Sequence, residues 1–498
     1  MTAKPVSKNR FIGAGISNLV YLGAQTVLFI VLTPLLLHRM GQEIYGVWML
    51  MLSIFGFATI ANFGTASTAT KYTSQFLGSE NAGQKLSVVF TFSYSTMLVI
   101  SVVACSVLLL LRPWLVENID IGPLVPASFS QALAVIAVSL LPFFLGLVSR
   151  GILLGLVRNG VANSIALITD LMLWSSALFV SVISHDILLL AFCVLASHLV
   201  RFVLMSFSAW WFTRKLYLRI AWAPDLTRQM LDYSFTIWLG SLGVVLFKSL
   251  DRMVLALTLD VAAVGIYSIG TSIAIRLNSL ANNFAQVLMP FASSREAAGR
   301  DRQIAETFRR SARFIGTLLA AAVGILVIWM DIILKTWLSQ DFAANYTDIF
   351  RILVIAYGVY SMYLPAFNVL AGRGWLKFPV FIQIVAGLGT VVAIWRLSIP
   401  YGLMGAAYAN FVYALVLLIH FYLAIRILKK PIRKSIADLG PPLLIVLVVS
   451  LLPLTYPSIY WRIAATFAAM CLVAFSILSS GGNRFLLNLA SRRFSGFG

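Results

Sequence analysis

The sequence predicts an all-α, polytopic membrane protein with about fourteen transmembrane helices, each of roughly 20 residues or more. Three observations lead to this fold class: the composition, the length of the apolar runs and the placement of charge between them. Hydrophobic residues make up 60% of the 498 positions and charged residues only 11%, and the mean hydropathy is +0.93. A soluble domain has roughly 25% charged residues. This chain therefore has too few polar side chains to cover a surface in water, so its composition fits a lipid environment.

Apolar runs long enough to cross a bilayer recur along the whole chain. A hydrocarbon core about 30 Å thick needs about 20 helical residues. The first run is longer than the core of a secretory signal, which has about 7–15 apolar residues, so we expect it to be retained as a helix. The predicted spans are 11–37, 44–67, 86–111, 126–149, 161–183, 187–212, 233–258, 261–290, 312–334, 347–371, 378–399, 401–425, 441–459 and 461–480.

The charged residues predict how these spans are oriented. Cytoplasmic loops of membrane proteins carry an excess of Lys and Arg. With the N-terminus in the cytoplasm, most of the 37 lysines and arginines fall in inner loops or at the chain ends. The outer loops keep only Arg39, Arg112, Lys335, Arg396 and Arg462. We therefore expect both termini in the cytoplasm and the chain in the inner membrane, and we read the net charge of +20 as topology, with no nucleic-acid partner.

An internal repeat predicts two lobes. A shift of about 222 residues lays the first half of the chain on the second, and six helices separate the copies, so both have the same orientation in the bilayer. Residues 41–46 then fall on residues 263–268. We expect two six-helix lobes around a central cavity (1–220 and 221–430), plus a two-helix tail with the cytoplasmic C-terminus (431–498).

Two prolines mark points where these lobes could bend. Pro142 in the fourth span and Pro365 in the tenth lie one position apart when the copies are overlaid. Proline removes a backbone hydrogen bond and kinks a helix. We predict both as hinges, and the alternative is that they are ordinary prolines of membrane helices, where proline is tolerated.

Charges inside the predicted spans are costly, and each one is a functional hypothesis. Lys248, Asp251 and Arg252 cluster in the seventh span, where Lys248 and Arg252 share a helix face and Asp251 can neutralise Lys248. Arg276 lies near the middle of the eighth span. The excess of cations suits an anionic ligand such as a diphosphate, for which Arg offers bidentate contacts. The alternatives are a structural network of the three clustered residues and, for Arg252, a side chain that reaches the interface.

The first lobe has one deep pair of charges. Asp170 lies in the fifth span and Arg201 in the sixth. A structural ion pair between them is the simpler interpretation, and a proton- or cation-coupling site at Asp170 is the alternative. Asn18 and Gln25 add polar groups to the first span, where interhelical hydrogen bonds are their common role.

Motifs for catalysis and metal binding are missing from the sequence. It holds no GxxxxGK[ST] phosphate loop, no GxSxG elbow and no HExxH helix motif. The four histidines are scattered, and Cys105, Cys193 and Cys471 sit in separate apolar segments without ligand spacing. We therefore expect no cofactor, no metal site and no enzymatic activity.

Five segments carry a family resemblance. They are residues 45–56, 62–64, 250–255, 264–268 and 290–291. Together they resemble the polysaccharide transporter family of the multidrug/oligosaccharidyl-lipid/polysaccharide exporter superfamily. The resemblance covers the two predicted repeats, and Asp251 is the position that matches a family motif best. The roles given to Lys248 and Arg276 come from depth and charge alone.

The resemblance implies a flippase of a bacterial inner membrane. Its substrate would be a polyprenyl-diphosphate-linked oligosaccharide for O-antigen, capsule or exopolysaccharide synthesis. Membrane lipid and a polysaccharide polymerase with chain-length machinery would be its partners. A multidrug or cation antiporter of the same superfamily and a flippase for a lipid-linked peptidoglycan precursor are the alternatives. The glycan, the coupling ion, the oligomeric state and the role of the last two helices stay open.

Overall fold

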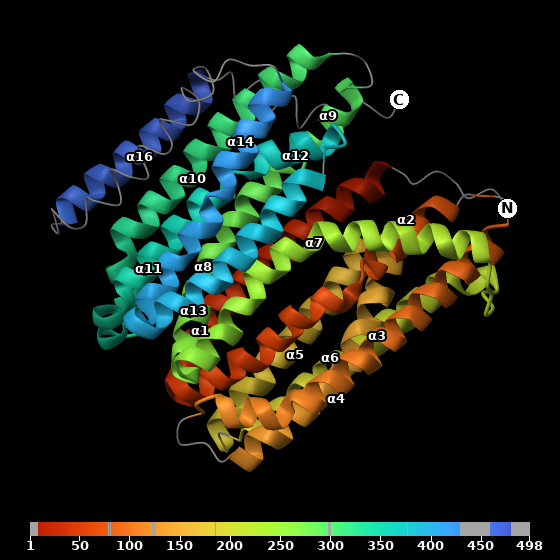
Figure 1. The fold of residues 1–498 in the computed structure, drawn as a ribbon, viewed down its shortest axis with the longest axis horizontal. Helices are drawn as coiled ribbons and strands as arrows, with labels where there is room; N and C mark the ends of the chain where they lie inside the picture. The colour runs from red at the N-terminus through yellow and green to blue at the C-terminus, as the bar shows by residue number, and fades with distance from the viewer. Residues whose placement is uncertain are drawn as a thin grey trace. The chain divides into compact units, whose positions relative to one another are not determined.

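The protein is helical throughout the part that the structure describes. The computed structural model describes residues 8–77, 79, 81–121, 126–184, 186–296, 300–375, 377–428 and 459–479. Every regular element within these ranges is a helix (Figure 1), which confirms the predicted all-α class. The predicted thirteenth span, 441–459, lies outside the described residues except for its last position.

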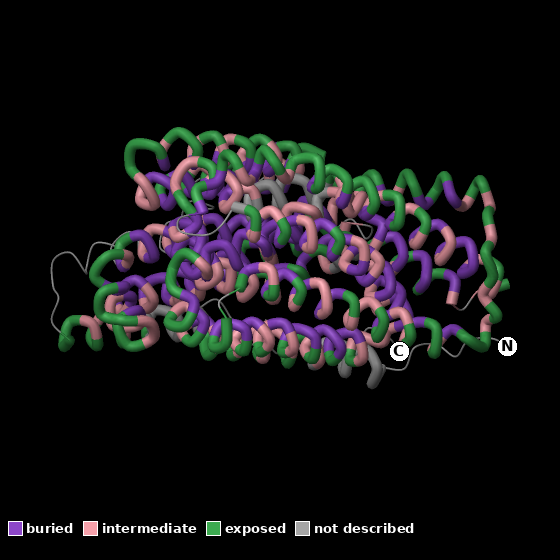
Figure 2. The backbone as a smooth tube through the Cα atoms, turned by 90° about the horizontal axis from the view of Figure 1, so that it is seen from below, coloured by how far each residue is buried: buried purple, intermediate pink, exposed green. Residues whose placement is uncertain are grey.

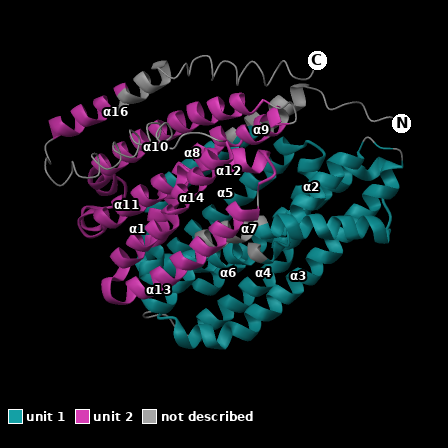
Figure 3. Cartoon of the chain, turned by 45° about the horizontal axis from the view of Figure 1, so that its top comes forward, with its two compact units in different colours: residues 1–266 teal, residues 267–498 magenta. Residues whose placement is uncertain are grey.

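The chain forms two compact units, residues 1–266 and 267–498 (Figure 3). The first contains α1 (Lys8–Ala58), η1 (Thr59–Asn62), α2 (Thr65–Phe76), α3 (Ala82–Asn118), α4 (Pro126–Gly155), α5 (Asn159–Ile183), α6 (Ile187–Thr213), η2 (Arg214–Leu216), α7 (Pro224–Thr258) and the start of α8 (Val261–Ala285). The second contains the rest of α8, α9 (Leu288–Glu296), α10 (Asp301–Trp337), α11 (Gln340–Ser361), α12 (Leu364–Gly372), α13 (Lys377–Ala414), α14 (Val416–Ile427) and α16 (Ile459–Ser479). The predicted lobes 1–220 and 221–430 follow the sequence repeat and stay a prediction.

Nine segments of the described chain are long and apolar enough to cross a membrane. Two of them, Val20–Ala58 and Lys377–Ile427, each overlap a pair of predicted spans. Gly41 divides α1 with φ 75° and ψ 172°, and Gly402 divides α13 with φ 56° and ψ −143°. Only glycine adopts such angles without steric strain, so one residue is enough to turn the chain between two helices.

The second predicted span, 44–67, is wrong as a continuous helix. The helix ends at Ala58, and after η1 the backbone of Phe63 and Gly64 is left-handed, with φ 50° and 67°. Two successive left-handed residues break the helical hydrogen-bond pattern. Hydropathy alone does not reveal such a break.

Buried and exposed positions alternate along the helices (Figure 2), and large apolar residues occur at both kinds of position. On α3, Val99, Val103 and Leu110 are exposed, and on α13 so are Val385 and Val392. Exposed apolar side chains that recur along whole helices are unfavourable in water and favourable in lipid. This surface, together with the apolar spans, supports a multi-pass membrane protein.

Small residues allow close helix contacts within the first unit. A Cβ added to Gly46 of α1 would lie 1.7 Å from the backbone oxygen of Val261 in α8. Gly265 lies against the same part of α1. Membrane helices commonly approach each other through such positions. Elsewhere α4 packs between α3 and α6 in this unit, and in the second unit α10 packs against α11 and α16.

The two predicted hinge prolines lie in different settings. Pro142 is inside the uninterrupted helix α4. Pro365 is in the first turn of α12, directly after a break between Ser361 and Leu364. Backbone N–H groups in the first turn of a helix have no acceptor within that helix. A proline there, which lacks the N–H, therefore removes no helical hydrogen bond. The proposed hinge roles stay predictions, and the break at Pro365 is a feature that the sequence overlay did not reveal.

Candidate functional site

The predicted pair of Asp170 and Arg201 is present, within a larger polar centre in the first unit. The two side chains form an ion pair between α5 and α6. From α1, Tyr21 donates a hydrogen bond to Asp170 Oδ2 at 2.9 Å, and Gln25 donates a second one. Arg201 Nε also donates to Thr169 Oγ1 at 2.8 Å. Helices α1 and α6 therefore supply the partners of one buried carboxylate on α5.

The polar centre extends along the contact between α1 and α5. Asn163 Nδ2 donates to Asn18 Oδ1 at 2.7 Å and to Ser17 Oγ at 3.0 Å. On α1 the polar positions 18, 21 and 25 share one face, and on α5 positions 163 and 170 are two turns apart. This spacing is the signal that could have assigned Tyr21 to the centre from sequence.

A buried histidine lies one turn from Arg201 on α6. His198 is 7% exposed, and its ring lies 4.5 Å from that of Phe55 and 5.2 Å from that of Phe143. Aromatic rings at these distances stabilise one another. The His198 ring therefore packs among aromatic side chains of α1 and α4.

The charges of the seventh predicted span lie on α7 in the first unit. Asp251 is 2% exposed, and its Oδ1 accepts a hydrogen bond from the Arg252 backbone N–H at 2.8 Å. Arg252 Nη1 donates to Ser53 Oγ of α1 at 3.3 Å. The side chain of Lys248 lies outside the described residues. The structure thus links α7 to α1 through Arg252, and the predicted neutralisation of Lys248 by Asp251 stays a prediction.

Arg276 lies on the part of α8 that belongs to the second unit. Its side chain is half-buried and donates to the carbonyl oxygen of Ser272, one turn earlier on the same helix. The anion-binding role predicted for this arginine stays a prediction.

Aromatic side chains cluster around Tyr360 of α11 in the second unit. Tyr360 stacks on Tyr363 with ring centroids 4.8 Å apart and contacts Tyr413 at 4.7 Å. Asn410 donates to the Tyr267 hydroxyl at 2.8 Å. His420 packs 5.2 Å from the Tyr363 ring. Charged residues meet at other places in this unit.

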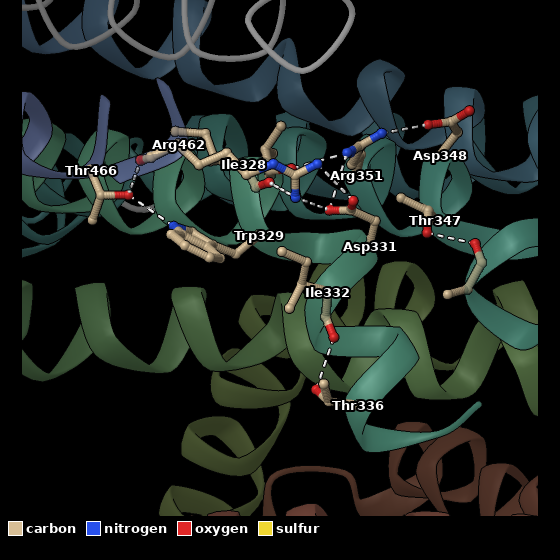
Figure 4. A network of polar contacts seen from close by, with 12 residues as sticks. Ile328, Trp329, Asp331, Ile332, Thr336, Thr347, Asp348, Arg351, Arg462 and Thr466 are labelled. Carbon is tan, nitrogen blue, oxygen red and sulfur yellow. Dashed lines mark hydrogen bonds and ion pairs between the residues drawn. The ribbon is translucent and has the colours of Figure 1, made fainter. Parts of the chain in front are cut away.

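One such place joins α10, α11 and α16 (Figure 4). Arg462 of α16 binds Asp331 of α10 through two hydrogen bonds of 2.7 and 2.8 Å. Arg351 of α11 lies 3.7 Å from the same carboxylate and binds Asp348 at 3.0 Å. The sequence interpretation treated Arg462 as a loop cation and passed over Asp331 and Arg351. The network fixes the tail helix α16 to α10 within the second unit.

Within the described ranges, no group of three His, Cys, Asp or Glu side chains is placed to hold a metal ion.

Comparison with known proteins identifies the family. Residues 40–347 match the family described as polysaccharide biosynthesis protein, which is more than half of the chain. The chain belongs to this family. The match runs from the second predicted span to the start of α11, so it includes Asp170, Arg201, Asp251 and Arg276. A comparison with curated protein sequences finds no match.

Solved structures show which fold this member of the polysaccharide biosynthesis family adopts. It is similar to the lipid II flippase MurJ in an inward closed conformation, with a TM-score of 0.71, 13% identity, and coverage of 94% of this chain and 100% of that one. It is also similar to an inward-facing multidrug resistance transporter of the MATE family in the MOP superfamily, with a TM-score of 0.70, 13% identity, and coverage of 81% and 94%. At these identities the likeness establishes the fold.

Proposed function

We propose that this protein is a flippase for polyprenyl-diphosphate-linked oligosaccharides. It would move the headgroup from the cytoplasmic to the outer leaflet of a bacterial inner membrane, by alternating access, for O-antigen, capsule or exopolysaccharide synthesis. Membership of the polysaccharide biosynthesis family is the observation that carries this proposal. The shared fold with a lipid II flippase supports it, because that fold can accommodate a lipid-linked substrate.

The physical need for such a protein is clear. The hydroxyls of a glycan lose their water partners in hydrocarbon, and each unsatisfied group costs several kcal/mol, on the order of 2–7. A protein that offers polar groups at membrane depth lowers this barrier. The described residues include polar side chains at depth on α1, α5, α7 and α8.

Arg252 and Arg276, with Lys248, are the residues proposed to bind the diphosphate. Guanidinium groups form charge-assisted, often bidentate hydrogen bonds with phosphate. Arg276 donates to the Ser272 carbonyl oxygen on its own helix, and Arg252 donates to Ser53 Oγ. Asp251 is proposed as a charge partner that limits the net positive charge of this region.

The rival function is a multidrug or cation antiporter. Such a mechanism needs a carboxylate that releases its partner to take up a proton or cation. Asp170 is the candidate, but it has Arg201, Tyr21 and Gln25 as partners. Removing one partner of a buried pair is unfavourable. The contacts favour a structural role for this pair, and they favour the flippase over the antiporter. A flippase for a lipid-linked peptidoglycan precursor differs only in the glycan.

The test uses proteoliposomes that contain a polyprenyl-diphosphate oligosaccharide. An impermeant glycan-oxidising reagent measures how much headgroup changes leaflet, with and without protein. We expect protein-dependent movement, and a large loss in Arg276→Ala and Lys248→Ala. Arg396→Ala is the matched control, because Arg396 is an exposed arginine that stacks on Trp395.

The outcomes separate the site from the function. Movement that the site variants leave unchanged would keep the flippase and remove the diphosphate site. No movement with several glycans, with or without an ion gradient or a membrane potential, would contradict the flippase and favour the antiporter. A drug-efflux measurement on the same vesicles, with Asp170→Asn, then tests the rival directly.

A further inference from the structure

The segment between α6 and α7 presents large apolar side chains on the surface of the first unit. This linker, residues 214–223, begins with η2 and continues without regular structure to Ala223. Ile220 is 94% exposed, Tyr217 83% and Trp222 63%. Full exposure of such side chains to water is unfavourable. Their surroundings therefore need an explanation.

The opposite side of the linker is fixed to the protein. Leu216, Leu218 and Ala221 pack against an apolar cluster formed by α2, α3 and α7. Tyr217 has a left-handed backbone (φ 48°, ψ 52°), and the residues after it have no regular structure. The inward packing of the three apolar residues turns Tyr217, Arg219 and Trp222 outward, so the exposed surface is a fixed feature of the fold.

Two hydrogen bonds place the linker along α3. The Arg219 backbone N–H donates to Ser87 Oγ and that of Ala221 to Thr91 Oγ1, both at 3.1 Å. Ser87 and Thr91 are one turn apart, and α3 begins at Ala82. The linker therefore follows α3 from its first turns inward. It reaches the level at which the predicted third span, 86–111, enters the bilayer.

Basic and aromatic residues surround the exposed apolar ones. Arg214, Lys215 and Arg219 are exposed, and the Arg214 guanidinium lies 3.6 Å from the centre of the Trp211 ring. Trp210 and Trp211 are exposed in the last turns of α6. Tryptophan is enriched at the membrane interface, and basic residues there attract anionic lipids.

We propose that the linker 214–223 is an interfacial anchor that binds anionic phospholipid headgroups. Tyr217, Ile220 and Trp222 insert at the boundary of the hydrocarbon, and the three basic side chains pair with lipid phosphates. The mixture of cations and apolar side chains at bilayer level favours a lipid partner over a soluble acidic protein. Because the linker is bonded to α3, the anchor holds this end of the first unit in the bilayer.

The test measures the depth of residue 220 in the full-length protein. A spin label is placed at Ile220→Cys after Cys105, Cys193 and Cys471 are replaced by Ala, and its accessibility to oxygen and to a water-soluble nickel chelate is compared. Vesicles contain phosphatidylcholine alone or with phosphatidylglycerol. We expect the label to be open to oxygen and shielded from nickel. A label at Ser74→Cys, an exposed position on α2, is the control and should be open to nickel.

Charge removal tests the headgroup contact. The triple change Arg214→Gln, Lys215→Gln and Arg219→Gln should shift the insertion equilibrium about fivefold for each lost cation when phosphatidylglycerol is present. The double variant Arg214→Lys with Arg219→Lys keeps the positive charges and should retain insertion. This variant separates the effect of charge from an effect on folding. A label at 220 that is open to nickel in both lipids would overturn the anchor. A label shielded from both reagents would show a protein partner instead. Insertion that is the same with and without phosphatidylglycerol, and the same after the three cations are removed, would overturn the headgroup contact.

Discussion

Replacing Arg462 by methionine should loosen the tail helix α16 from α10. Arg462 donates two hydrogen bonds to Asp331 and a third, of 3.2 Å, to the carbonyl oxygen of Ile328. Hydrogen bonds to charged groups contribute about 1.5–3 kcal/mol, and exposed ion pairs about 0–1 kcal/mol. The Asp331 side chain is 37% exposed and that of Arg462 only 13%, so we expect about 2 kcal/mol for the loss.

Hydrogen exchange measured by mass spectrometry is the assay. Local opening controls exchange, and about 1.4 kcal/mol corresponds to a factor of ten, so amides in the first turns of α16 should exchange roughly 30-fold faster. Arg351 remains beside Asp331 in the variant, so the carboxylate keeps a partner. Arg396→Met removes one exposed arginine elsewhere and is the control. Unchanged exchange of residues 459–466 in Arg462→Met would refute the idea that this network holds α16.

Three further predictions concern packing and polar contacts. Asp170→Asn should lower the thermal stability of the purified protein. The double variant Asp170→Asn with Arg201→Gln should lose less stability than the two single variants add up to, because the two residues share their contacts. Additive losses would contradict the pair. Gly46→Ala should prevent folding, as a Cβ there would overlap backbone, whereas Gly160→Ala, with open space around it, should leave size-exclusion profiles unchanged. Trp329→Phe removes a 2.8 Å hydrogen bond to α16 and should lower stability by about 1 kcal/mol in a thermal-shift assay; a loss near zero would show the bond to be dispensable.

Composition and hydropathy predicted the fold class because the bilayer leaves few choices. Backbone groups in hydrocarbon must be satisfied within each segment, so long apolar runs become helices. The break after Ala58 was missed since it depends on the left-handed backbone of Phe63 and Gly64, which apolar composition does not encode. Asp170 and Arg201 could be paired in advance because they are the deeply placed charges of the predicted first lobe and have opposite signs.

The contacts of other charged groups depended on the fold. Asp331 and Arg462 are 131 positions apart, and no local spacing connects them. Arg252 similarly finds Ser53 on α1, far away in sequence. Depth in a span indicates that a charge needs a partner, and only the packing of helices determines which partner it obtains. The diphosphate site stays a prediction for the same reason.

The single-residue turns at Gly41 and Gly402 have a consequence for biosynthesis. At each turn, one helix ends and the next begins with a single glycine between them. No longer loop is present that would let the first span insert into the membrane before the second. The two spans must therefore enter the bilayer together, as one helical hairpin. A Cβ added at either glycine would meet open space, but an insertion would lengthen a turn that a single residue makes. Reporters of topology belong in the longer connections, and the glycine turns are the points at which an insertion would disturb the assembly of two spans at once.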